Sequence, residues 1–302
     1  MLQGAMIVWF VLTIASLAFV VWDSIFNGVT SWVQKLAWVL VVAYTGPVGC
    51  FLYLMTCRRP FPGGHDAFTK KTWKQAVNSE MHCLAGDATG IVIAAAIVPV
   101  LGLTNGWDSV FEYLAGFICG LFIFQALMMR GMFEGDYWKA VQKTFFAETV
   151  SMNCVMAGML PTMIVLASFW PGSLEPSTPE FWFRMSIASI VGLITAYPVN
   201  YWLVASHLKH GCMTLPGKDT PALGHGSPEM PMASAMEDTM DEMHGHDYNP
   251  GEDHGHKGHG KMQMATLPFA TQCALIAASF ALLIGAGLVT NLFVPISFGL
   301  TN

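Results

Sequence analysis

Charged residues are scarce in this sequence. Only 11% of the 302 residues are Asp, Glu, Lys or Arg, whereas 54% are hydrophobic. An ordinary soluble domain carries about 25% charged residues, so this composition excludes that class. Apolar runs of about 18 residues or more recur along most of the chain, and this is the length that crosses a bilayer as a helix. The sequence therefore predicts an all-α integral membrane protein that is embedded in the lipid bilayer.

The sequence also lacks the motifs of several functional classes. The seven cysteines show no CxxC spacing and do not predict a disulfide framework. No phosphate-cradling glycine loop, Ser-His-Asp order, HExxH helix or haem-attachment motif is present. The net charge of −6 comes largely from one acidic segment and gives no support for nucleic-acid binding. Nothing in the sequence indicates catalysis or an organic cofactor, so we expect a protein that is not an enzyme.

Seven apolar runs predict about seven transmembrane helices. They cover approximately Ala5–Val21, Val33–Thr56, His82–Leu103, Val110–Met129, Ala147–Trp170, Phe181–Ala205 and Phe269–Val294. The domains expected from them are two transmembrane helices in residues 1–60, a cytoplasmic connection over 61–77, a four-helix central unit over 78–211, a disordered loop over 212–266 and a last transmembrane helix in 267–302.

Basic residues are divided unevenly between the two ends of these spans. Twelve of the 14 Lys and Arg residues follow the second, fourth or sixth span, and Lys209 is counted among them as a residue of the long loop. Only Lys35 and Arg184 fall on the other side. Because cytoplasmic connections carry the excess of basic residues, the predicted orientation has the N-terminus inside and the C-terminus outside. We expect a multi-pass protein of the bacterial inner (cytoplasmic) membrane.

The third span begins with polar residues, although ionisable groups inside a membrane are energetically costly. Cys83 and Asp87 lie four residues apart, on one face of a helix, and His82 lies on a neighbouring stripe. Glu148 and Met152 have the same spacing on the fifth span. The predicted orientation places all five in the cytoplasmic third of the membrane. Soft thiol, thioether and imidazole ligands with carboxylates suit copper(I), so these residues predict a metal site.

A simpler interpretation exists for each part of this site. In this interpretation His82 and Asp87 are helix-end polar residues that a neighbour satisfies, and Met152 with the methionines after it only fills the core. Glu148 is harder to explain in this way, because an unpaired carboxylate at membrane depth is costly. We expect its partner to be His82, Lys143 or Asn200.

Small residues and a proline predict helix packing in the same region. Two pairs of glycines at four-residue intervals would let helices approach closely, and a proline in the sixth span should kink it and free a carbonyl group. The residues expected to serve packing in this way are Gly86, Gly90, Gly116, Gly120, Pro198 and Asn200.

The loop after the sixth span differs in composition from the rest of the chain. It holds eight of the ten histidines and eight of the 20 methionines, together with many acidic residues. A solvated acidic linker is one interpretation. The other is a metal-collecting segment that binds copper or zinc with little selectivity. Its predicted ligands are His244, His246, His254, His256 and His259.

Three motifs of the central unit resemble a known family. They are His82-Cys83-Leu84 with Gly86 and Gly90, the stretch Glu148-Thr149-Val150-Ser151, and Ala196-Tyr197-Pro198-Val199-Asn200 with Trp202 and Leu203 after it. In this order they resemble the bacterial membrane family known as domain of unknown function 4396, over about residues 78–211. The resemblance implies a four-helix membrane unit, without an established activity. Short members of the family often have a second cysteine where Asp87 stands and a glutamate where Ile91 stands, which argues against a pair of thiolate ligands here. Members with His/Met-rich segments look associated with copper handling.

These observations leave two main functional hypotheses. The first is a protein of soft-metal homeostasis, with copper as the expected metal, that binds or transports the ion through the four-helix unit and collects it with the loop. The second is a non-transporting subunit that helps to assemble or anchor a metal-containing membrane complex or a metalloprotein. A membrane oxidoreductase is a weaker third hypothesis, because it would need a haem or flavin that the sequence does not indicate.

Overall fold

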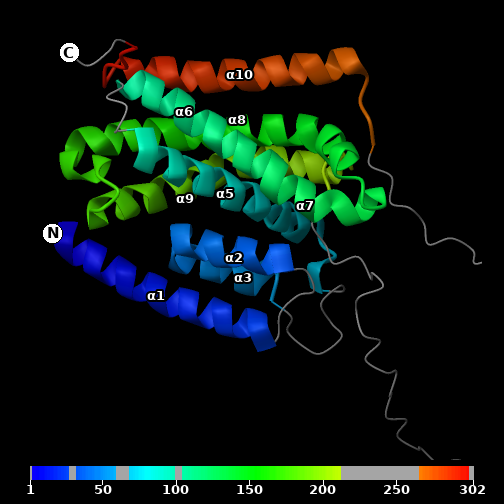
Figure 1. Cartoon of the computed structure of the whole chain (residues 1–302), viewed down its shortest axis with the longest axis horizontal. Coiled ribbons are helices and arrows are strands. Elements are labelled where there is room, and N and C mark those ends of the chain that lie inside the picture. Colours follow the sequence, from blue (N-terminus) through cyan, green and yellow to red (C-terminus); the bar gives the residue numbers. More distant parts are fainter. Residues whose placement is uncertain (1, 27–31, 59–67, 99–103, 212–264, 299–302) are drawn as a thin grey trace, which may run out of the picture. The chain divides into compact units, whose positions relative to one another are not determined.

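The computed structural model describes residues 2–26, 32–58, 68–98, 104–211 and 265–298, and all the regular elements in these ranges are helices. In chain order they are α1 (Leu2–Phe26), α2 (Trp32–Thr45), α3 (Pro47–Thr56), α5 (Thr72–Ile97), α6 (Asn105–Ile118), the π-helix η2 (Cys119–Gln125), α7 (Ala126–Met129), the short 3-10 helix η3 (Arg130–Phe133), α8 (Tyr137–Phe169), the short 3-10 helix η4 (Pro171–Leu174), α9 (Pro179–Ala205) and α10 (Phe269–Asn291) (Figure 1).

Within the described ranges, six helices are long and apolar enough to cross a membrane. They are α1, α5, the continuous run α6–η2–α7, α8, α9 and α10. Among these, α5 is the most buried, because it packs against α6, η2 and α9 and also touches α2, α3 and α8. In contrast, α1 and α10 bury little of their surface inside the protein. The predicted all-α architecture is confirmed, with six helices of membrane-spanning length among the described residues, and the polar residues of α5 are buried within it.

The predicted second span is not one helix. Gly46 and Pro47 divide it into α2 and α3, because Gly46 has a φ of +57° that favours glycine and Pro47 has no N–H to continue a helix. A Cβ atom at position 46 would lie 3.0 Å from the indole of Trp9, which places this turn against the middle of α1. The continuous helix expected over Val33–Thr56 is therefore replaced by two short ones.

These two short helices fold back on each other as a hairpin, side by side in Figure 1. The rings of Trp38 in α2 and Tyr53 in α3 are 5.4 Å apart between centroids, although a straight helix would separate them by about 22 Å. Near the open end, the Gln34 side chain donates a hydrogen bond to the Cys57 sulfur at 3.8 Å. At that end Arg58 also forms an ion pair with Asp23 of α1, at 3.2 Å. The two outer ends of the hairpin thus lie at the same level as the C-terminal end of α1.

Four other elements differ from the sequence-based prediction. The third span begins ten residues early, since α5 is continuous from Thr72. The fifth span also begins ten residues early, at the start of α8, and this helix is capped by the Asp136 side chain accepting from the backbone N–H of Lys139 at 2.9 Å. The fourth span contains a π-helical turn, η2, and α9 remains helical through Pro198.

Candidate functional site

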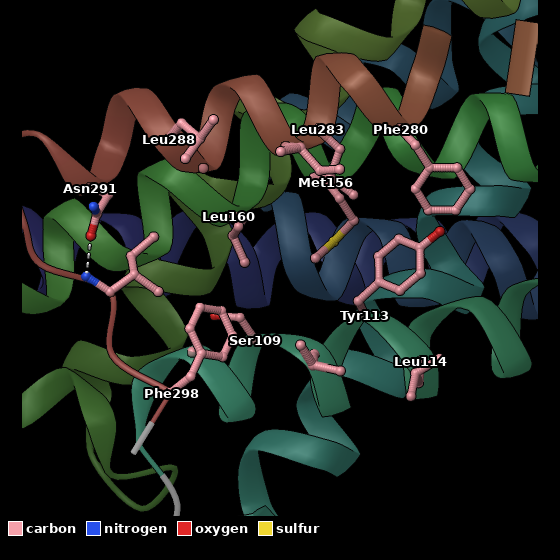
Figure 2. A pocket seen from close by; sticks show the side chains of 15 residues that line it. Ser109, Tyr113, Leu114, Met156, Leu160, Phe280, Leu283, Leu288, Asn291 and Phe298 are labelled. Carbon is pink, nitrogen blue, oxygen red and sulfur yellow. Dashed lines mark hydrogen bonds between the residues drawn. The ribbon is translucent and has the colours of Figure 1, made fainter. Parts of the chain in front are cut away.

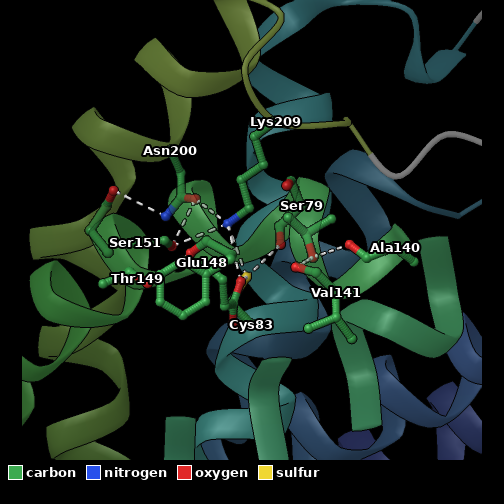
Figure 3. A network of polar contacts seen from close by, with 12 residues as sticks. Ser79, Cys83, Ala140, Val141, Glu148, Thr149, Ser151, Asn200 and Lys209 are labelled. Atoms are coloured by element: carbon green, nitrogen blue, oxygen red, sulfur yellow. Dashed lines mark hydrogen bonds and ion pairs between the residues drawn. The ribbon is translucent and has the colours of Figure 1, made fainter. Parts of the chain in front are cut away.

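A buried polar cluster lies where α5, α8 and α9 meet, and Figure 3 shows its members pointing toward one another. Cys83 comes from α5, Glu148 and Ser151 from α8, and Asn200 from α9. The fifth member is Lys209, which follows α9. None of the five residues exposes more than 2% of its surface. This group, Cys83, Glu148, Ser151, Asn200 and Lys209, is called the lysine cluster below.

The ammonium group of Lys209 is at the centre of the lysine cluster. It donates hydrogen bonds to Asn200 Oδ1 at 2.7 Å, Cys83 Sγ at 2.9 Å and Ser151 Oγ at 3.1 Å. An ammonium has three N–H groups, so these three acceptors match all of its donors. Glu148 Oε2 lies 4.0 Å from the same nitrogen and accepts a hydrogen bond from the Cys83 thiol at 2.9 Å. A cation is therefore enclosed by one sulfur and three oxygens, with a carboxylate to balance its charge.

A turn at the end of α9 brings Lys209 into this position. The N–H of Leu208 donates to Leu203 O at 2.9 Å and that of His207 to Val204 O at 3.0 Å, which is the Schellman pattern. His207 adopts the left-handed conformation that this pattern requires, with a φ of +56°. Leu203 and Leu208 share a small apolar cluster, as is common in such caps. The chain thus reverses after α9 and returns to the bundle one residue later, at Lys209.

The carboxylate groups of Asp87 and Glu148 both approach the π-helix η2. Both carboxylates lie beside Gly120 of η2, since a Cβ atom there would meet Asp87 Oδ1 and would lie 3.0 Å from Glu148 Oε1. These oxygens and Asp87 Oδ2 have no hydrogen-bond partner within the described part of the chain. Asp87 is fully buried. Single π-helical turns often occur at functional sites. In η2, Gly120 has no side chain at the point where the carboxylates of Asp87 and Glu148 come close to the helix.

Glu80 and His82 are buried outside these two groups. Both oxygens of Glu80 and both ring nitrogens of His82 lack a hydrogen-bond partner among the residues that the structure describes. Burial lowers the pKa of His210, which follows Lys209. A histidine with a lowered pKa is neutral at pH 7, so Lys209 remains the cation nearest the carboxylates.

The predicted metal residues are brought together only in part. Cys83 pairs with one oxygen of Glu148, and Asp87 approaches Gly120 beside the other oxygen of the same carboxylate. Met152 belongs to the hydrophobic core, with its methyl group against Gly116. In the described ranges, His, Cys, Asp and Glu side chains form no group of three or more that could hold a metal ion. The predicted loop ligands, from His244 to His259, lie outside the described residues.

The four glycines predicted for packing lie where α5 meets α6 and η2. A Cβ atom on Gly86 would be 2.6 Å from Gly120 Cα, and one on Gly90 would be 2.7 Å from Gly116 Cα. Such distances leave no room for a side chain between the two backbones. This close approach is what allows Asp87 to reach the π-helix.

Sequence reasoning missed Lys209 and misassigned the partner of Glu148. Lys209 was counted as a loop residue, whereas its side chain is fully buried in the bundle. Within the described residues, the cation beside Glu148 is Lys209 rather than His82 or Lys143, and Asn200 shares this lysine with Glu148. The available signal was an unpaired carboxylate at membrane depth together with a lysine four residues after the end of a helix. Composition obscured that signal, because the segment from Ser206 onward looks like one polar loop.

An apolar cavity of about 430 Å³ lies between α6, α8 and α10 (Figure 2). Its walls include Leu114, Leu160 and Leu288, and no charged residue lines it. The Tyr113 hydroxyl at its edge donates to Asn153 Oδ1 at 2.7 Å, and the Asn153 amide donates to Ser279 Oγ at 2.9 Å. A bare ion would lose its hydration in this cavity without gaining a charged partner. The cavity is therefore not the ion site.

The structural unit that holds the cluster corresponds to a known sequence family. Residues 72–209 match the family model described as Domain of unknown function (DUF4396). No curated protein and no solved structure matches the chain. The matched segment starts with the first residue of α5 and ends at Lys209, so it contains every member of the lysine cluster. The resemblance inferred from the three motifs is thereby confirmed: residues 72–209, somewhat under half of the chain, form a four-helix membrane unit similar to the DUF4396 domain.

Proposed function

We propose that the four-helix unit binds a soft metal cation within the bacterial inner membrane and moves it across, with copper as the expected ion. The observation that carries this proposal is the buried cation of the lysine cluster. A positive charge is already held inside the helix bundle by one sulfur and three oxygens. Sulfur among the acceptors favours a soft ion, and copper(I) is the common soft monovalent ion of proteins.

The cation would bind after a rearrangement rather than in a preformed cage. Lys209 occupies the centre of the acceptors, and the described residues contain no ready group of three metal-binding side chains. An incoming ion would therefore meet Cys83, Glu148, Ser151 and Asn200 only when the ammonium is elsewhere. In this proposal Asp87, with its unpartnered oxygens, is the next acidic group along the path.

The histidine-rich segment has a supporting role in this proposal. His244, His246, His254, His256 and His259 would capture copper or zinc at the membrane surface and raise the local ion concentration. Such ligands bind as neutral imidazoles, so capture should weaken below about pH 6. The ordering of several flexible side chains also opposes tight binding.

The hairpin changes the orientation that we propose for the chain. A helix needs about 20 residues to cross the bilayer, whereas α2 has 14 and α3 has 10. The hairpin would then enter and leave on the same side, and six helices rather than seven would cross. With the connection before α5 in the cytoplasm, Lys35 also moves to the cytoplasmic side, and Arg184 alone remains opposite. This agrees better with the positive-inside rule and places both ends of the chain outside.

Labelling of introduced cysteines tests this orientation. Gln3→Cys, at the exposed N-terminal end of α1, should react with a membrane-impermeant maleimide in intact cells. Lys35→Cys, at the start of α2, should react only after the cells are opened. A cysteine-free background provides the control. The opposite pattern would restore the seven-span arrangement with the N-terminus inside.

Silver uptake by vesicles tests the transport function, because silver(I) is a soft monovalent ion that does not change its oxidation state in buffer. Purified protein in liposomes should raise the initial rate of uptake above that of empty liposomes. Cys83→Ser should reduce that rate about tenfold or more, since it replaces the one soft acceptor of the lysine cluster. Cys273→Ser, on the exposed face of α10, is the matched control and should leave the rate unchanged.

A second candidate function is a non-transporting subunit that assembles or anchors a metal-containing complex. The contacts of Gly86 and Gly90 with the backbone of α6 and η2 favour it, because such packing resists the movements of a carrier. In that case the lysine cluster would only hold α5, α8 and α9 together. Wild-type protein that is well folded in liposomes but gives no silver uptake would favour this alternative.

A further inference from the structure

The position of Lys209 suggests how the proposed site would be opened and what charge it would accept. Its ammonium group has an acceptor for each N–H, and its side chain is fully buried. Lysine is rarely buried so completely, because it must leave water and fix a long side chain. Yet Lys209 does not belong to a transmembrane helix, since α9 ends at Ala205.

The turn that carries Lys209 is joined to the bundle by backbone hydrogen bonds and by the buried side chains of Leu208 and Lys209. Its backbone bonds run mainly back to the end of α9, where the N–H groups of Leu208 and Lys209 both donate to Leu203 O at 2.9 and 3.1 Å. One further bond joins Ala265 N to His207 O at 2.9 Å. His207 itself occupies a left-handed conformation that non-glycine residues rarely adopt. Movement of the turn would separate Leu208 from Phe146 and Val150 of α8, whereas the contacts of α5, α8 and α9 with one another do not depend on the turn.

The charges in the cluster restrict what can replace the ammonium. With Lys209 in place, one positive charge faces the Glu148 carboxylate, and Cys83 is a thiol that donates to this carboxylate. Withdrawal of Lys209 alone would leave a buried carboxylate without its cation, which is costly. If one monovalent cation enters as the ammonium leaves, the buried charge is unchanged. A divalent cation would add an uncompensated positive charge.

We propose that Lys209 is a tethered cation that exchanges one for one with a soft monovalent metal ion, copper(I) or silver(I). This inference rests on the proposed function and adds to it the charge of the substrate and the gate of the site. The ammonium leaves toward the cytoplasm and stays protonated. The metal binds Cys83 Sγ, whose proton passes to Glu148 along the existing hydrogen bond. The sum of buried charges is therefore the same before and after the exchange.

Acylation of Lys209 by a soluble amine-reactive ester tests the exchange on the full-length protein in detergent. The extent of modification is measured for each lysine-containing peptide by mass spectrometry. Without metal, Lys209 should react far more slowly than Lys143, which is exposed on α8. Silver(I) should increase the modification of Lys209 about tenfold or more, because the population with the ammonium outside changes from minor to major. Zinc(II) should give no such increase, and Lys143 should react equally in all conditions.

The Cys83→Ser variant links this response to the cluster. It keeps a hydroxyl acceptor for the ammonium but lacks the soft ligand, so silver(I) should no longer increase the modification of Lys209. Unchanged modification of Lys209 in a wild-type protein that transports silver would overturn the exchange and leave the proposed function standing. An equal response to zinc(II) would overturn the charge restriction. If silver is neither transported nor able to expose Lys209, the proposed function fails as well.

Discussion

Replacement of Lys209 with methionine is expected to lower the free energy of unfolding by about 3–5 kcal/mol, the usual cost of removing one partner from a buried charged pair. The loss would come mainly from Glu148, whose carboxylate would stay buried without a cation. Ser151 and Asn200 would also lose a charged donor, at 3.1 and 2.7 Å respectively. Methionine has nearly the length and volume of lysine, so little of the effect would come from packing. Thermal or denaturant unfolding in detergent measures the change.

Lys143→Met is the matched control for this variant. Lys143 lies on α8 but is exposed, so its replacement should change the stability by no more than about 0.5 kcal/mol. The double variant Lys209→Met with Glu148→Gln should recover part of the loss, because it removes the uncompensated charge with the cation. A Lys209→Met protein as stable as the wild type would mean that the ammonium is not enclosed. Both the proposed site and the exchange would then lose their structural basis.

The membrane character of the chain could be predicted because it depends on local composition. Apolar length alone located the helices that became α1, α5, α8, α9 and α10, although α5 and α8 each begin ten residues before the predicted span. The hairpin could not be found in this way. Val33–Thr56 is apolar throughout and long enough to span, and only Gly46-Pro47 distinguishes a hairpin from a kinked helix. That distinction depends on contacts such as Trp38 with Tyr53, which join residues 15 apart.

The candidate site was predictable where its residues follow helical spacing. Cys83 and Asp87 share a face of α5, and the positive-inside rule placed Glu148 at the same depth. These are properties of single helices and of their orientation. Lys209 could not be placed by either argument, because its position depends on a Schellman turn formed by a histidine rather than the usual glycine. Charge counting then assigned it to the solvated loop, whereas its side chain is buried in the helix bundle.

Gly90→Ala is expected to destabilise the protein by about 1–3 kcal/mol or more, the cost of extra atoms in a tightly packed core. The added methyl group would lie 2.7 Å from Gly116 Cα and would meet the carbonyl of Ala115. Both neighbours are backbone atoms of α6, so no side chain can rotate away and the two helices must separate. Unfolding in detergent and the yield of folded protein in the membrane measure this effect.

Gly285→Ala provides the comparison, since a Cβ atom at this position of α10 has nothing within 4 Å. It should be neutral or stabilise the protein by up to about 1 kcal/mol, because alanine favours a helix more than glycine does. The effect of Gly90→Ala on silver uptake then separates the two functional hypotheses. Separation of α5 from α6 would displace Asp87 from η2, so a carrier should lose uptake even in the fraction that remains folded. If folded Gly90→Ala protein transports silver as well as the wild type, the contact between α5 and α6 serves assembly alone, and Asp87 has no part in the path of the ion.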